Sequence, residues 1–133
     1  MYEFLEHTGE LAVRVKGKDL PSLFISAAAA MNDYLLQDLT PGAEQGTETI
    51  EVSAADYRSL LVAWLSEILY RIEVNDCIYQ KFEVKVLEKT ALIAEITGAR
   101  VRKLARDIKA ATHHGLEIKR IPDGYEVVII FDI

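Results

Sequence analysis

Residues 125–133 read YEVVIIFDI, and this stretch decides how the rest of the chain can fold. Positions 127–131 are all apolar, and successive side chains of a strand point to opposite faces of its sheet. Both faces of this strand would therefore carry apolar side chains, a pattern typical of strands that are buried on both sides. The sequence predicts an interior terminal strand, covered on both faces, that ends in a carboxylate at Asp132.

A turn precedes this strand and indicates its partner. Pro122, Asp123 and Gly124 are residue types that favour tight turns. Leu116 and Ile118 lie before the turn with a polar residue between them. These features predict a C-terminal hairpin.

Two helices are predicted earlier in the chain. Asp19 is a good N-cap with Pro21 in the first turn, and Ser53 with Asp56 resembles a capping box at the start of the second helix. Apolar side chains recur at helical spacing after both starts. They are Leu20, Leu23, Phe24, Ala27, Ala28, Met31 and Leu35 in the first helix and Leu60, Leu61, Trp64, Leu65, Ile68, Leu69 and Ile72 in the second.

The remaining segments are strands and one long loop. Residues 38–49 contain Pro41, Gly42 and Gly46 and predict a surface loop. Alternation of apolar and polar residues around 11–16, 50–52, 81–86 and 92–96 predicts half-buried strands. Long helices early and strands late favour an α+β fold, with two long helices packed on one mixed β-sheet. We expect residues 1–133 to form a single domain, since domains commonly have about 100 to 150 residues.

Composition narrows the functional class. The net charge is −6, so broad and stable binding to nucleic acid is not expected, because such binding depends on neutralising phosphates. Cys77 is the single cysteine, which excludes an intrachain disulfide and favours the reducing cytoplasm. The apolar runs are too short to span a bilayer, and the first residues lack the pattern of a secretory signal. We expect a cytoplasmic protein without a membrane partner.

Acidic groups lie near both ends of the chain. Asp132 is followed by the carboxylate of the last residue, Ile133, and Glu10 lies in a polar break near the start. If the fold brings the two ends together, three anionic oxygen groups meet, which hard cations such as calcium and magnesium prefer. The alternative is that Asp132 is a solvated acid at a strand end and Glu10 an ordinary loop acid.

A basic segment is the other chemical signal. Arg100, Arg102, Lys103, Arg106 and Lys109 lie within ten positions of an otherwise acidic chain. Such a patch could bind phosphate, a nucleotide or an acidic partner, or it could be a solvated loop balanced by acids elsewhere. The sequence has no glycine-rich phosphate loop, no zinc-ligand spacing and no nucleophile elbow. These patterns favour an accessory or binding protein over an enzyme.

Several short motifs, in order along the chain, resemble the archease family. No single motif is decisive, but the ordered set covers essentially the whole chain. The matching stretches are residues 2–8 (YEFLEHT), 20–24 (LPSLF) with Ala27 and Ala28, 60–67 (LLVAWLSE), 109–117 (KAATHHGLE) and 131–133 (FDI).

The resemblance implies a protein cofactor, with no catalytic residue of its own, of the RtcB-type RNA ligase that acts in tRNA splicing and RNA repair. Archeases promote guanylylation of the ligase and its turnover, which would bring the cofactor near GTP in the partner's site. The family's divalent-metal site, for which calcium is the expected ion, falls on Glu10, Asp132 and Ile133. Its functional lysine falls on Lys109, and His7 belongs to the first motif.

One position departs from the family pattern. Many members read His-Thr-Ala-Asp where this chain has Gly9 and Glu10 after His7 and Thr8. Glutamate keeps the charge and the oxygen ligands but reaches about one methylene further, and glycine adds backbone freedom. The departure therefore changes the expected geometry of the metal site.

The competing interpretation is a chaperone or an RNA-binding adaptor, serving an RNA-modifying methyltransferase. It would bind RNA through the basic contact patch formed by Arg100, Arg102, Lys103 and Arg106. Binding through these side chains would weaken strongly with added salt. An independent metal-dependent hydrolase is disfavoured, because no nucleophile or base can be assigned.

Overall fold

The structure is a computed structural model that describes residues 1–5 and 9–133. In chain order the elements are β1 (Tyr2–Leu5), β2 (Glu10–Gly17), α1 (Leu20–Leu36), β3 (Glu44–Ser53), α2 (Tyr57–Asn75), β4 (Cys77–Glu88), β5 (Ala91–Arg100), β6 (Ala110–Ala111), β7 (Lys119–Ile121) and β8 (Gly124–Asp132).

The strands form two antiparallel sheets. One has the order β1-β2-β8-β6, with β7 also paired to β8, and the other has the order β3-β5-β4. The α+β class and the two long helices are as predicted, whereas the single mixed sheet is wrong. Apolar alternation fixes which face of a strand is buried, but it does not encode the neighbour or the direction of that neighbour.

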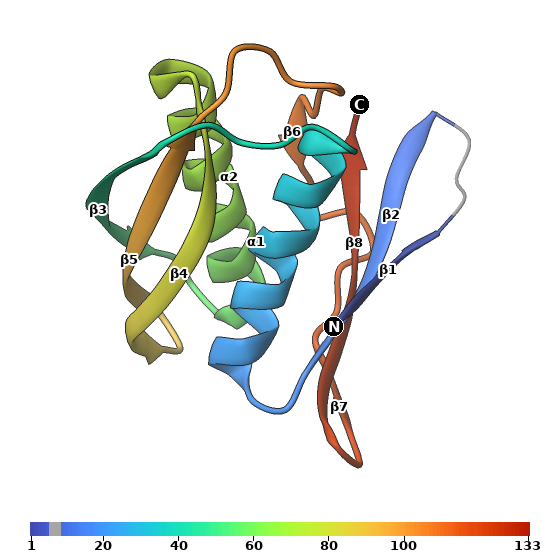
Figure 1. Cartoon of the computed structure of the whole chain (residues 1–133). Helices are drawn as coiled ribbons and strands as arrows, with labels where there is room; N and C mark the ends of the chain where they lie inside the picture. The colour runs from blue at the N-terminus through green and yellow to red at the C-terminus, as the bar shows by residue number, and fades with distance from the viewer. Residues whose placement is uncertain (6–8) are drawn as a thin grey trace.

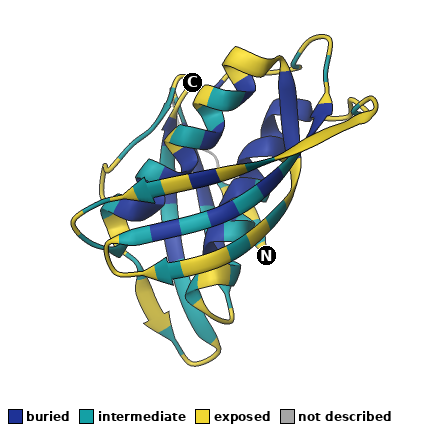
Figure 2. Ribbon diagram, turned by 90° about the vertical axis from the view of Figure 1, so that its left-hand side faces the viewer, coloured by how far each residue is buried: buried dark blue, intermediate teal, exposed yellow. Residues whose placement is uncertain are grey.

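Both helices contribute to the layer between these sheets (Figure 1). Helix α1 packs on β2 on one side and on β4 on the other, and α2 packs beside it against β3 and β4. In the β3-β5-β4 sheet, buried and partly buried residues alternate along most of β5, whereas most residues of β3 and β4 are exposed or partly buried (Figure 2). Trp64 of α2 is fully buried, and its Nε1 donates a hydrogen bond to the carbonyl oxygen of Phe24 at 2.9 Å. This bond ties the two helices together inside the core.

An aspartate caps each helix. Asp19 Oδ1 accepts a hydrogen bond from the backbone N–H of Ser22 at 2.8 Å, and Asp56 Oδ1 does the same for Ser59 at 2.8 Å. These bonds favour the charged carboxylates and so lower the pKa of both aspartates. The expected capping box at Ser53 is wrong, because Ser53 ends β3 and Asp56 alone is the N-cap.

The loop predicted over residues 38–49 is shorter than expected. Strand β3 begins at Glu44, and its register with β5 shifts between Glu44 and Thr47. A bulge of this kind interrupts the alternation of side chains, which hid the first part of the strand in the sequence. Beyond the bulge, the hydroxyl oxygens of Thr47 and Thr97 lie 3.0 Å apart across the two strands.

Strand β8 is interior in its sheet, as predicted, with β2 on one side and β6 and β7 on the other. The β7–β8 hairpin also forms where it was expected. Val127, Ile129 and Phe131 are buried, but Val128 and Ile130 are only partly covered. The expected cover on both faces is therefore wrong for one face, since the helices lie on the other.

No helix among the described residues is long and apolar enough to cross a membrane.

Candidate metal centre

Glu10 and Asp132 lie directly opposite each other. Glu10 is the first residue of β2 and Asp132 the last of β8, and they are partners in the antiparallel register. Side chains of directly opposed residues project from the same face, with Cβ atoms about 4.5 to 5.5 Å apart. The fold therefore brings two carboxylates, 122 positions apart in sequence, to one edge of the sheet.

Lys109 lies on the other side of Asp132. Its backbone N–H donates a hydrogen bond to the carbonyl oxygen of Asp132 at 2.7 Å, and the following residue, Ala110, is the register partner of Asp132. The Lys109 side chain is exposed and lines a pocket of about 350 Å³ at the C-terminal ends of both helices, with Leu35 and Ile72 among its walls. This backbone hydrogen bond fixes the position of the Lys109 main chain beside the end of β8.

Ile133, the last residue, lies at the same end of the sheet. It follows Asp132 directly and is 40% exposed. Gly9 has a φ of +74°, a left-handed conformation that glycine adopts without steric penalty. Gly9, which departs from the family pattern, therefore determines the direction of the backbone just before Glu10. His7, the other predicted residue, lies outside the described part of the chain.

Charges on the same face of this sheet differ along its length. Four residues along β2 from Glu10, Arg14 pairs with Glu3 at 2.8 Å and with Glu126 at 3.3 Å. Opposite charges meet there, whereas like charges meet at Glu10 and Asp132. Like charges directly opposed on a sheet destabilise it, and a cation bound between them would offset the repulsion.

The donor chemistry fits a hard cation. Two side-chain carboxylates and a terminal carboxylate offer only oxygen ligands, which suit calcium and magnesium and not zinc. Among the described residues, no group of three or more His, Cys, Asp and Glu side chains could hold a metal ion. Water or partner oxygens would complete the shell of six to eight ligands that calcium takes.

The basic contact patch lies at the end of β5 and in the segment that follows it. Arg100 ends β5, and Arg102, Lys103 and Arg106 are exposed in the segment that connects β5 to β6. The Arg106 guanidinium lies 4.9 Å from the centre of the Tyr34 ring on α1, a stacking contact that the sequence did not reveal. Within the described residues, none of the four makes an ion pair.

A second pocket was not predicted from the sequence. Arg58 and Lys89 lie 31 positions apart and both line a pocket at the start of the two helices. No local spacing connects them, so only the folded structure could show it.

The fold and these placements define a small α+β protein in which two carboxylates and a lysine gather at one end of a sheet. The chain belongs to the Archease protein family (MTH1598/TM1083), whose model matches residues 2–133.

Individual relatives show the same likeness over nearly the whole length. Protein archease of Methanosarcina acetivorans is 31% identical over 140 residues, covering 99% of this chain and 95% of the relative. Protein archease of Methanopyrus kandleri is 32% identical and covers 99% of both chains.

Solved structures agree with the fold. The solution structure of protein 1598 from Methanobacterium thermoautotrophicum has a TM-score of 0.84 and 26% identity, covering 99% of this chain and 98% of that one. A crystal structure from Thermotoga maritima, described as an archease and possible chaperone, has a TM-score of 0.69. At 18% identity, over 97% of this chain and 94% of that one, it supports the fold alone.

Proposed function

We propose that this protein is a non-catalytic activator of an RtcB-type RNA ligase, acting in the cytoplasm in tRNA splicing and RNA repair. It would promote the GTP-dependent guanylylation of the ligase and its turnover. The observation that carries the proposal is the convergence of Glu10, Asp132 and Lys109 at one end of the β1-β2-β8-β6 sheet in a member of the Archease family.

In this proposal, Glu10, Asp132 and the terminal carboxylate of Ile133 hold a divalent cation, with calcium as the expected ion. The bound ion would supply positive charge near the phosphates of the ligase's nucleotide. Lys109, whose side chain is exposed and whose backbone is bonded to Asp132, would add a second positive charge. Positioning and charge stabilisation are the main contributions a protein makes to this kind of transfer chemistry.

His7 completes the proposed site as a contact of the first motif with the ligase. Its role rests on the family resemblance alone, because it lies outside the described residues.

The test is single-turnover formation of the covalent ligase–GMP adduct, with a cognate ligase, GTP and divalent metal. This protein should accelerate the reaction, and Lys109→Ala should reduce the acceleration at least tenfold while leaving the urea unfolding midpoint unchanged. Lys119→Ala is the matched control, because Lys119 is also an exposed lysine beside β8 but lies near the opposite end of that strand. Full acceleration by Lys109→Ala would refute the role given to this side chain.

The metal part of the proposal has its own test. Asp132→Asn, Glu10→Gln and removal of Ile133 should each weaken calcium binding and adduct formation together. A variant that no longer binds calcium but still activates the ligase would separate the metal from the activation.

A second candidate function is an RNA-binding adaptor or chaperone, such as a partner of an RNA-modifying methyltransferase. The exposed basic contact patch favours it, as does the description of the Thermotoga maritima relative as a possible chaperone. Replacing Arg102, Lys103 and Arg106 together with glutamine should then abolish a salt-dependent RNA affinity. Ligase activation that survives this triple change would favour the activator proposal.

A further inference from the structure

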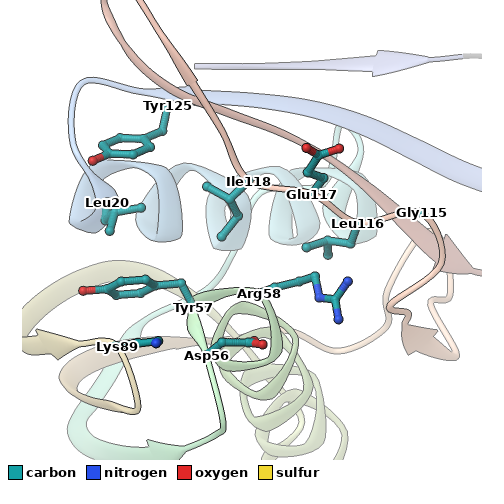
Figure 3. A pocket seen from close by; sticks show the side chains of 10 residues that line it. All are labelled: Leu20, Asp56, Tyr57, Arg58, Lys89, Gly115, Leu116, Glu117, Ile118 and Tyr125. Atoms are coloured by element: carbon teal, nitrogen blue, oxygen red, sulfur yellow. The ribbon is translucent and has the colours of Figure 1, made fainter.

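A pocket of about 690 Å³ lies where both helices begin, between their first residues and the segment 115–118 (Figure 3). Its volume falls in the range of small-molecule sites, roughly 300 to 1,000 Å³. Tyr125, on its rim, lies near the start of β8, whereas Asp132 ends that strand. The two are seven positions apart on the strand, about 23 Å at the usual rise. The pocket is therefore a different site from the candidate metal centre.

The floor and walls of this pocket are largely apolar. Leu116 is buried beneath it, and Leu20 and Ile118 lie close by (Figure 3). The rings of Tyr57 and Tyr125 add two flat walls from different elements. Apolar and aromatic walls of this kind suit a ligand with a flat, apolar body.

Two cationic side chains lie at the edge of these walls. Arg58 projects from the first turn of α2, and Lys89 from the turn between β4 and β5. Both are exposed, and neither makes an ion pair or a side-chain hydrogen bond with a described residue. Their donors are available to an anion from outside.

Two acids also line the pocket. Asp56 caps α2, where it accepts the hydrogen bond from Ser59, and its charged carboxylate also interacts electrostatically with Arg58 and Lys89. Glu117 points away from Arg58 in the close-up, and it also lines the neighbouring hollow that contains Arg14 and Lys119 (Figure 3). Since Asp56 already caps the helix, the attraction for an anion comes from the two side chains and not from the helix end.

We propose that this pocket binds a small anionic molecule with a flat, apolar body. Arg58 and Lys89 hold its phosphate or carboxylate group, and the ring lies against Leu20, Tyr57 and Ile118. This binding is independent of the ligase proposal, because it uses none of the residues of the candidate metal centre.

Phenyl phosphate is a suitable probe, because it joins a dianionic group to a flat ring. Titrated into the full-length protein and followed by two-dimensional NMR, it should shift the backbone amides of Tyr57, Gly115 and Leu116 in a saturable way. A ligand of this size should bind with a dissociation constant on the order of a few millimolar. Phenol and inorganic phosphate should each bind at least fivefold more weakly, since each lacks one half of the recognised chemistry.

The variant Arg58→Gln/Lys89→Gln should weaken phenyl phosphate at least fivefold. Lys81→Gln/Lys85→Gln is the matched control, because it removes the same charge from exposed positions on β4 outside the pocket. Absence of a saturable shift would overturn the proposal. Equal affinity for inorganic phosphate, or unchanged affinity in the pocket variant, would overturn it as well.

Discussion

Two of the places where charged side chains from different elements meet in this protein differ in the signs of those charges. In the first, Arg71 of α2 pairs with Glu67 on its own helix at 3.0 Å and with Glu48 of β3 at 3.0 Å. In the second, Glu10 of β2 and Asp132 of β8 oppose each other with the same sign of charge. The first arrangement stabilises the contact between a helix and a sheet, whereas the second would hold a cation in the function proposed above.

The first cluster is completed by a buried phenol. The Tyr79 hydroxyl donates a hydrogen bond to Glu48 and accepts one from Asn75 at 3.1 Å. Burial and the hydrogen bond to Glu48 raise the pKa of Tyr79 far above its usual value. A cluster of complementary charges serves the fold, and two like charges at the end of a sheet suit the proposed function.

The largest expected effect is that of calcium on stability. If the proposed site binds calcium in the folded protein alone, calcium at one hundred times its dissociation constant should raise the free energy of unfolding by about 2.7 kcal/mol. Urea unfolding with calcium or with a chelator measures this. Asp132→Asn should lose the increase, and an equal increase in that variant would place the ion elsewhere.

Breaking the first cluster should have the next largest effect. Arg71→Met leaves Glu48 without its cation, and we expect the free energy of unfolding to fall by about 2 kcal/mol, between the values for exposed and buried pairs. The Arg71 side chain is 23% exposed. Arg14→Met is the control: the Arg14 side chain is 41% exposed, so its loss should cost less than about 1 kcal/mol. Equal losses in urea unfolding would remove the distinction between the clusters.

Alkaline pH should act on the first cluster through Tyr79. Because the folded protein keeps this phenol protonated, the unfolded chain releases more protons above its own pKa of about 10. Stability should therefore fall as pH rises above that value, by up to about 1.4 kcal/mol for each pH unit. Tyr79→Phe should show a shallower fall between pH 9.5 and 11.5. Identical slopes in the two proteins would show that Tyr79 does not carry this dependence.

The smallest effect should come from relieving the like charges without metal. In chelator, Asp132→Asn should raise the free energy of unfolding by about 0.2 to 0.5 kcal/mol. Glu126→Gln, on the same strand and face, should act in the opposite direction, because Glu126 pairs with Arg14 at 3.3 Å. A loss of stability in both variants would mean that repulsion at Asp132 is not significant.

The sequence predicted helix starts and turns well where they depend on a single residue type. Asp19 is the N-cap of α1, and Pro122 to Gly124 forms the turn of the terminal hairpin, because caps and turns depend on neighbours in sequence. The start of β3 was missed, since the bulge near Gly46 breaks the alternation. The single mixed sheet was wrong because strand pairing is a long-range choice.

The sequence predicted the candidate site only for the case that the fold brings the two ends of the chain together. The sequence placed carboxylates at Glu10 and Asp132 and a lysine at Lys109, but it could not show that they meet. Their meeting depends on the antiparallel register of β2 with β8 and of β6 with β8. A shift by one residue would turn each side chain to the other face of the sheet.

The sequence by itself determined the two capped helices, the apolar terminal strand, the family resemblance and the types of chemical group available. Only the tertiary structure decided that the strands divide into two sheets, that Glu10 opposes Asp132, and that Arg58 and Lys89 share a pocket. The reason is the range of the interactions. Capping and periodicity act within a few residues, whereas pairing, register and pockets arise from the packing of segments that are distant along the chain.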